Sequence, residues 1–274
     1  MPLKLWIPAL CALTVSFTGA TDRSIADDDP HAGHGHTKPL HLTHPLVTES
    51  PLPENEARIA FSYAALPEDE GDEFTLTASV EFAPWDWFSI EVSLPLTHLD
   101  PTGAPSQTHL GNAAIGLKFA TFALEDLGLL LAAGVEVGLP TGDEERGIGN
   151  DHVIELEPWL GVGLKRGRFE WIARIGAGFP LNTNGDPEAD AELHWSTSIL
   201  FHVIDDTIAV LVELDGLHVF GGEEDGYDGI AVTPGVRFAP FDNPDFTFGI
   251  GVRLPVGNDR DADVQVIFTV YIHY

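Results

Sequence analysis

Apolar and polar residues alternate with a period of two along most of the chain after Ala57. The pattern is clearest near the C-terminal end, where every second residue from Val264 to Ile272 is apolar. Successive side chains of an extended chain point to opposite faces, so this pattern predicts strands that each have one apolar face. It predicts twelve strands, over residues 57–65, 73–83, 87–97, 111–122, 128–139, 152–164, 168–181, 191–203, 207–219, 228–239, 245–255 and 263–274.

The lengths of these strands and of their connections favour a barrel that crosses a membrane. Most of the predicted strands have ten to fourteen residues, whereas strands of soluble proteins usually have about 5–6. A hydrocarbon band about 25 Å tall, crossed at about 40°, needs roughly 10 residues per strand. Short connections, such as 84–86 and 165–167, alternate with longer ones, such as 97–110 and 140–151, which is the arrangement of outer-membrane barrels.

We therefore expect an all-β fold, a 12-stranded antiparallel transmembrane β-barrel with a disordered N-terminal arm. An even number of strands puts both ends of the barrel on the side of the short connections, which is the periplasmic side in outer-membrane barrels. A soluble up-and-down barrel or sandwich is the alternative, because its strands also need one apolar face. The charged and glycine-rich opposite face favours the membrane barrel over this alternative.

The residues before the first strand divide into two segments. A basic start at Lys4, an apolar run over 5–17 and the small residues of 18–20 predict a secretory signal peptide over 1–20. Residues 21–56 lack periodicity and are rich in Asp, His and Pro, which predicts a disordered periplasmic arm. The barrel then occupies 57–274, and the expected location is the outer membrane of a Gram-negative-type bacterium.

Histidine is concentrated in the predicted arm. Neutral imidazoles on a flexible segment can bind zinc, copper or nickel, so the arm is a candidate site for metal capture, and no other cofactor is expected. A solvated polar spacer is the alternative. The candidate ligands are His31, His34, His36, His41 and His44.

Composition excludes several classes of protein. The net charge of −30, with 13 Lys and Arg against 43 Asp and Glu, excludes a protein that binds the nucleic-acid backbone. Cys11 is the only cysteine, so a disulfide framework is excluded. No run of eighteen apolar residues is present, so the sequence predicts no transmembrane helix.

The alternation assigns charged residues of the strands to the interior of the barrel. A 12-stranded barrel lies between the filled barrels of eight strands and the open pores of sixteen, so we expect a narrow polar channel. An excess of acids favours cations or neutral polar solutes, whereas ionic pairing across the barrel would make a rigid plug instead. The expected lumen residues are Arg58, Glu81, Glu91, Lys118, Glu136, Glu155, Glu157, Glu170, Arg174, Glu192, Glu213, Asp215, Arg237 and Arg253.

Several segments resemble one family of outer-membrane proteins. They are His44–Pro51, Ser93–Leu96, Leu110–Lys118, Gly138–Gly142 and Val270–Tyr274. The chain is similar in these to the outer-membrane transporter family named after the meta-pathway of phenol degradation. The resemblance covers most of the chain after the signal peptide. It implies an outer-membrane barrel with a role in uptake, which includes hydrophobic or aromatic compounds among the candidate solutes.

A catalytic function is not expected. His194 and Ser196 have the spacing found in outer-membrane phospholipase, but the alternation puts both in the lumen, and no nearby Asn follows to orient the histidine. We expect a channel for small solutes, and the alternative is a non-conducting barrel that scavenges metals or supports the envelope. The expected partners are outer-membrane lipid and lipopolysaccharide, a small solute, and the barrel-assembly machinery, which would bind the C-terminal strand; nucleic acid is not among them.

Overall fold

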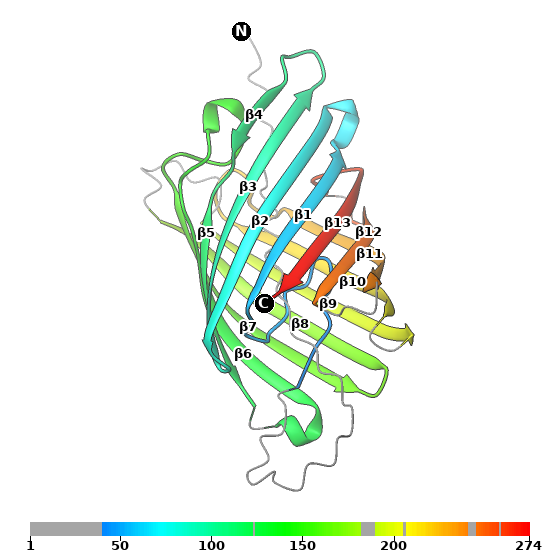
Figure 1. Ribbon diagram of the computed structural model, residues 1–274. Helices are drawn as coiled ribbons and strands as arrows, with labels where there is room; N and C mark the ends of the chain where they lie inside the picture. Colours follow the sequence, from blue (N-terminus) through cyan, green and yellow to red (C-terminus); the bar gives the residue numbers. More distant parts are fainter. Residues whose placement is uncertain (1–39, 123, 182–189, 205–206, 241–244, 258) are drawn as a thin grey trace, which may run out of the picture.

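The computed structural model describes residues 40–122, 124–181, 190–204, 207–240, 245–257 and 259–274. Long, tilted antiparallel strands form a ring around a central space (Figure 1). The strands are β1 (Glu56–Ala65), β2 (Gly71–Trp85), β3 (Phe88–Pro101), β4 (Gln107–Leu110), β5 (Ala114–Thr121), β6 (Leu129–Gly138), β7 (Ile154–Arg166), β8 (Phe169–Leu181), β9 (Ala191–Ile204), β10 (Ile208–Phe220), β11 (Asp228–Phe238), β12 (Phe246–Pro255) and β13 (Val264–His273).

The sheet closes on itself through its first and last strands. β1 pairs with β13 from Glu56 opposite His273 to Ala65 opposite Val264, and its other edge pairs with β2, which pairs with β3. The short strand β4 and the strand β5 both pair with β3, one after the other, so they fill a single place in the wall. The prediction of a closed 12-stranded antiparallel barrel is therefore confirmed for the described residues.

The fourth predicted strand, over residues 111–122, is wrong at its start. Residues 111–113 are not in a strand, and β5 begins only at Ala114. The loop over 139–153 takes their hydrogen bonds: the Thr141 hydroxyl accepts the N–H of Ala113, and the Asn112 side chain accepts the N–H of Asn150. The same loop packs Ile148 against Leu66 and Leu99. Loop contacts therefore replace the sheet ladder here, and alternation does not reveal them.

The third predicted strand, over 87–97, is longer in the structure because β3 continues to Pro101, which lies opposite Gly71 of β2. The bounds of the other strands lie within two residues of those predicted. Three complete helical elements lie within the described residues, and each is a single 3-10 turn: η1 (Pro67–Asp69), η2 (Glu125–Leu127) and η3 (Glu144–Arg146). Among the described residues, no helix has the length and apolar character needed to cross a membrane.

The two faces of the barrel wall differ as the alternation requires. Large apolar side chains are exposed on the outside, and Val80, Val92 and Val212 each retain about half of their accessible surface. Charged, small and glycine residues occupy many of the inward positions, where Glu81, Glu170 and Glu213 are fully buried. Five large apolar side chains also point inward, namely Leu130, Ile172, Leu200, Leu211 and Ile267. Exposed apolar groups and buried carboxylates reverse the usual distribution of a soluble protein.

Candidate functional site

The interior of the barrel contains a segment of the chain itself. Residues 40–55, which we call the lumen plug, precede β1 and lie inside the ring of strands (Figure 1). Leu42, Leu46 and Thr48 of the plug have no accessible surface. The plug has no regular secondary structure, so its backbone groups must find hydrogen bonds elsewhere.

Glu213 of β10 supplies acceptors for three consecutive N–H groups of the plug. Its Oε1 accepts the N–H of Leu46 at 2.5 Å, and its Oε2 accepts the N–H of Thr48 at 2.6 Å. The N–H of Val47 is 3.1 Å from both oxygens. A carboxylate that accepts several backbone N–H groups is held by charge-assisted bonds, so Glu213 anchors the centre of the plug.

Glu170 of β8 holds the beginning of the plug. Its Oε2 accepts the N–H of Thr43 at 2.6 Å, and its Oε1 accepts the Thr43 hydroxyl at 3.2 Å. The same carboxylate is 2.7 Å from Nζ of Lys165 and 2.8 Å from Nε2 of His202. The alternation of the strands therefore brings residues from β7, β8 and β9 to one contact with the plug.

Two cations of the wall hold the second half of the plug. Lys118 of β5 donates to the carbonyl oxygen of Ser50 at 3.0 Å, and its Nζ lies 3.5 Å from Glu49. Arg174 of β8 is 2.7 Å from the other oxygen of Glu49 and 2.8 Å from Glu157 of the wall. Glu49 is the acid of the plug that both cations share, so the plug completes an ionic network that the wall alone leaves open.

Two wall residues also hold the backbone of the plug at Pro45. The carbonyl oxygen of Pro45 accepts hydrogen bonds from Arg237 of β11 at 3.4 Å and from the Tyr271 hydroxyl of β13 at 3.2 Å. The Arg237 guanidinium lies 4.1 Å from the centre of the Tyr271 ring, a distance at which cation–π attraction is effective. All three residues lie on the inner side of the barrel.

Glycines of the wall make room for the leucines of the plug. A Cβ atom at Gly235 or Gly251 would lie 2.5 Å from Cδ1 of Leu46, and one at Gly249 would also meet this side chain. A Cβ at Gly163 would overlap Leu42. Glycine in the interior of a strand often marks a close approach of other atoms, and here those atoms belong to the plug.

The plug also completes the apolar core inside the barrel. Leu42, Leu46, Val47 and Leu52 are the plug members of this cluster. The wall contributes Leu130, Ile172, Leu200, Leu211 and Ile267. Burial of a leucine side chain stabilises by about 1.5–3 kcal/mol, so the apolar groups of the plug add to the polar anchors.

The predicted arm thus differs from the structure over residues 40–55, which lie within the lumen. Composition alone predicts disorder because prolines and polar residues dominate, but wall carboxylates and cations satisfy the polar groups of this segment. The signal that could have indicated docking is the match between Leu42 and Leu46 on the segment and four glycines at inward positions of three strands, β7, β11 and β12. Residues 1–39, which include the predicted signal peptide, lie outside the described residues.

The inner wall carries the fourteen charged residues that alternation assigned to it. Eight of them are buried: Arg58, Glu81, Glu91, Lys118, Glu136, Glu170, Glu213 and Arg237. The other six are partly exposed: Glu155, Glu157, Arg174, Glu192, Asp215 and Arg253. Arg253 pairs with Asp215 at 2.7 Å and with Asp261 at 2.9 Å. The part that these side chains play in the passage of solutes stays a prediction.

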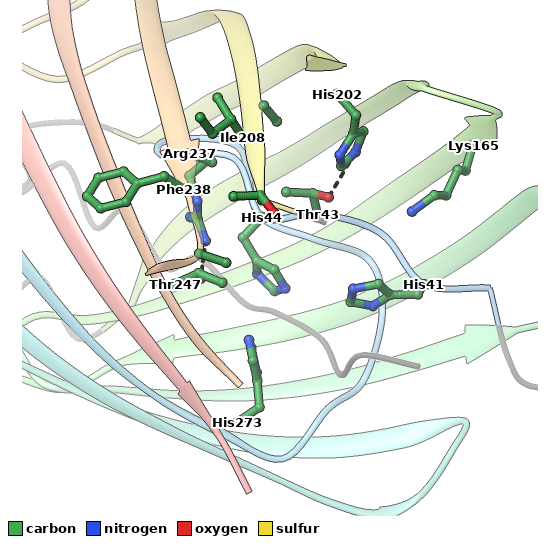
Figure 2. A pocket seen from close by; sticks show the side chains of 13 residues that line it. His41, Thr43, His44, Lys165, His202, Ile208, Arg237, Phe238, Thr247 and His273 are labelled. Carbon is green, nitrogen blue, oxygen red and sulfur yellow. Dashed lines mark hydrogen bonds between the residues drawn. The ribbon is translucent and has the colours of Figure 1, made fainter. Parts of the chain in front are cut away.

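A cavity of about 60 Å³ opens between the plug and the wall at the end of the barrel that carries the short connections. Figure 2 shows His41 and His44 of the plug, His202 of β9 and His273 of β13 around it. Nε2 of His44 lies 3.4 Å from Glu54, and its ring centre is 5.8 Å from that of His273. The cavity therefore joins histidines of the plug to histidines of the wall.

Burial keeps the plug histidines neutral. It lowers the pKa of His41 to about 4, with Lys165 as a second cause. Burial also lowers the pKa of His44 well below its usual value, and Arg237 contributes in the same direction. His44 has almost no accessible surface, so its protonation would put an unsolvated positive charge near Arg237. The side chain of His41 is partly exposed to the cavity, and Lys165 opposes its protonation.

Of the five predicted metal ligands, only His41 and His44 lie within the described residues. His31, His34 and His36 lie outside the described residues. His41 and His44 line the cavity of the lumen, and neither belongs to a group of three metal-ligand side chains among the described residues. Metal capture by the arm stays a prediction.

His194 and Ser196 lie on the inner phase of β9, and Trp195 lies on the outer one opposite Gly216 of β10. Nε2 of His194 is 2.8 Å from Glu192, and its Nδ1 is 3.9 Å from Glu157. The histidine therefore lies beside two carboxylates, an arrangement that alternation along one strand does not reveal.

The fold is similar to that of solved outer-membrane barrels. The COG4313 outer membrane channel from Pseudomonas putida F1 matches with a TM-score of 0.66 at 10% identity, over 83% of this chain and 97% of that one. The NanC porin matches with a TM-score of 0.54 at 9% identity, over 80% and 98%. The KdgM porin matches with a TM-score of 0.51 at 10% identity, over 79% and 99%.

No protein-family model matches the chain, and no curated protein does. At 9–10% identity, the likeness to the three barrels shows the fold. The resemblance to the meta-pathway family is not tested by these matches and stays a prediction.

Proposed function

We propose that the chain is an outer-membrane channel for small solutes, closed by the lumen plug in the form described here. The observation that carries this proposal is the polar inner wall, whose Glu213 and Lys118 hold the plug through backbone contacts. Such contacts are reversible, since water can replace each of them when the plug leaves.

Two features of the outer surface support a membrane location. Exposed apolar side chains cover the middle of the barrel, as a hydrocarbon environment requires. Aromatic rings gather where the short connection follows β2: Trp85 stacks on Trp87 at 5.4 Å, and Trp87 lies 6.2 Å from Phe119. Trp and Tyr are enriched where a membrane meets water, so this group fits a girdle at the periplasmic interface.

The similarity of the fold to one channel and two porins supports passage of solutes in general. The excess of acids over bases on the wall supports a preference for cations. Lipid, lipopolysaccharide and the barrel-assembly machinery remain the proposed partners, and hydrophobic or aromatic solutes remain candidates through the family resemblance alone.

Conductance in planar bilayers tests the proposal. We expect the wild-type protein to conduct rarely, and a variant that lacks residues 40–52 to conduct in discrete, larger steps. In a KCl gradient, the reversal potential of this variant should shift toward the equilibrium potential of K⁺. A folded deletion variant that stays silent would reject the channel. Heat-modifiable migration on gels identifies folded barrels, and Asp126→Asn, a change at an exposed turn, serves as a control.

A barrel that scavenges metals or supports the envelope is the second candidate, favoured by the ionic network around Glu49. It predicts no conductance from either the wild-type or the deletion protein. It also predicts that Zn²⁺ binding falls when His31, His34 and His36 are replaced by serine. Conductance separates the two candidates, because metal capture by the arm is compatible with both.

A further inference from the structure

Three side chains above the plug converge in the half of the lumen near the long loops. Glu155 comes from the beginning of β7, and Glu192 and His194 come from β9. One ligand atom of each lies within 4.8 Å of the corresponding atoms of the other two. None of the three contributes to the hydrogen bonds of Glu213, Glu170 or Lys118 that hold the plug.

Two glycines of the intervening strand let these side chains meet. In β8, Gly178 lies opposite Glu192, and Gly176 lies opposite His194. A Cβ atom at Gly178 would lie 2.7 Å from Oε1 of Glu155 and 3.7 Å from Nε2 of His194. Side chains from β7 and β9 therefore reach across the backbone of β8, which forms the floor of a small cradle.

The cradle has an excess of negative charge. Within the described residues, no Lys or Arg forms an ion pair with Glu155. The nearby cation, Arg174, is engaged by Glu49 at 2.7 Å and by Glu157 at 2.8 Å. Two carboxylates that share a partly buried site repel each other, and a bound cation would remove this repulsion.

The donor atoms indicate the kind of cation. An imidazole nitrogen with two carboxylate oxygens suits zinc and similar divalent transition metals better than Ca²⁺ or Mg²⁺, which prefer oxygen ligands alone. Nε2 of His194 lies 2.8 Å from Oε2 of Glu192, and its Nδ1 lies 3.9 Å from Oε2 of Glu157. A carboxylate behind a ligating histidine commonly orients its ring, and Arg174 holds Glu157 in place.

We propose that Glu155, Glu192 and His194 form a binding site for a divalent transition-metal ion such as Zn²⁺, and that Glu157 positions His194. Three protein ligands leave one or two places for water or for a group carried by the ion. The loop over 139–153, which leads into β7, carries four acids, Asp143, Glu144, Glu145 and Asp151, against one base, Arg146, so its charge raises the local concentration of cations near the start of β7. Metal binding at this site requires neither the predicted histidine arm nor movement of the plug.

Zn²⁺ titration by calorimetry tests the site in the full chain in detergent. The parent protein carries His31→Ser, His34→Ser and His36→Ser, which remove arm histidines as competing ligands. We expect the parent to bind an equivalent of Zn²⁺ that is lost in His194→Ala and in the double variant Glu155→Gln/Glu192→Gln. We expect Glu157→Gln to bind it about 10–100-fold more weakly.

His98→Ala is the matched control, because His98 lies outside the cradle and its ring bonds the Thr108 hydroxyl. It should leave the Zn²⁺ isotherm of the parent unchanged. Heat-modifiable migration identifies the variants that fold. Diffraction at the zinc absorption edge should give an anomalous peak among the three side chains.

The proposal is overturned if folded His194→Ala and Glu155→Gln/Glu192→Gln proteins bind Zn²⁺ as the parent does, or if the anomalous peak lies elsewhere. Binding is measured without any flux of solute. Failure of the metal site and failure of the proposed channel are therefore separate results.

Discussion

The Glu213 carboxylate accepts the N–H of Thr48 at 2.6 Å inside the barrel. This bond joins the middle of β10 to a segment that precedes the first strand, over 165 positions of the sequence. The plug forms no helix or strand. Its position in the lumen therefore depends on such contacts with the wall. Each anchor therefore offers a way to shift the balance between closed and open forms.

Glu213→Gln should favour the open form. The variant keeps the shape of the side chain but removes its charge and turns an NH₂ group toward the backbone N–H groups of the plug. Hydrogen bonds to charged groups contribute about 1.5–3 kcal/mol, so the open fraction should rise about 10–100-fold. Single-channel recordings measure this fraction. Equal open fractions for Glu213→Gln and the control Asp126→Asn would contradict the role of Glu213 as an anchor.

Gly163→Ala should displace the plug by steric overlap. The three atoms nearest to a Cβ at this position all belong to Leu42 and Pro51 of the plug. The added methyl group should therefore clash with the plug and leave the strands of the wall in place. We expect more frequent opening in bilayers, and a smaller effect of Gly163→Ala when Leu42→Ala has removed the overlapping atoms. Contacting residues show such non-additive effects in double-mutant cycles.

Gly116→Ala is the control for this overlap, because its Cβ would lie 3.7 Å from the nearest atoms, which belong to Glu91. It should leave the open fraction near that of the wild type. Strictly additive effects of Gly163→Ala and Leu42→Ala would show that the contact seen here does not govern docking.

Alternation along the strands was enough to predict the barrel. A strand with one face toward lipid must carry an apolar side chain at every second residue. It placed Glu213 and Lys118 on the inner wall for the same reason. It could not predict the plug, since Leu42 and Leu46 are spaced irregularly and their partners come from strands far along the chain. The cradle at Glu155 and His194 was missed because the two residues meet only through the glycines of β8.

Val212→Arg tests whether the outer face lies in a membrane. Val212 is in the middle of β10 and is 51% exposed on the outside. Arginine at the midplane of a bilayer costs about 2–4 kcal/mol, and the cost falls to about 0–1 kcal/mol near the interface. Val256→Arg is the matched control, because Val256 follows the end of β12 and is 60% exposed.

Unfolding by urea in lipid vesicles measures the free energy of unfolding of each variant and of the wild type. We expect Val212→Arg to lower the free energy of unfolding by about 2–4 kcal/mol and Val256→Arg to change it by less than about 1 kcal/mol. In a soluble barrel both positions would face water, and both changes would have small effects. Similar small effects would therefore argue against the membrane location.

Acid should release the plug through its histidines. His41 and His44 are neutral when docked because burial lowers the pKa of each, to about 4 for His41. In the released segment they regain a pKa near 6.5, so the released form binds more protons. The groups that face the two rings are Lys165, Glu170, His202, His273, Arg237, Lys118 and Glu54.

The sign follows from proton linkage. Docking has its full stability above about pH 6.5 and loses it progressively as the pH falls toward 4, because protons stabilise only the released form. We expect the open fraction to rise over this range in bilayers that contain a chelator. In His41→Asn/His44→Asn the rise should be much shallower, since asparagine does not titrate. Wall carboxylates are the same in both proteins, so an equally steep rise in the double variant would assign the response to them instead.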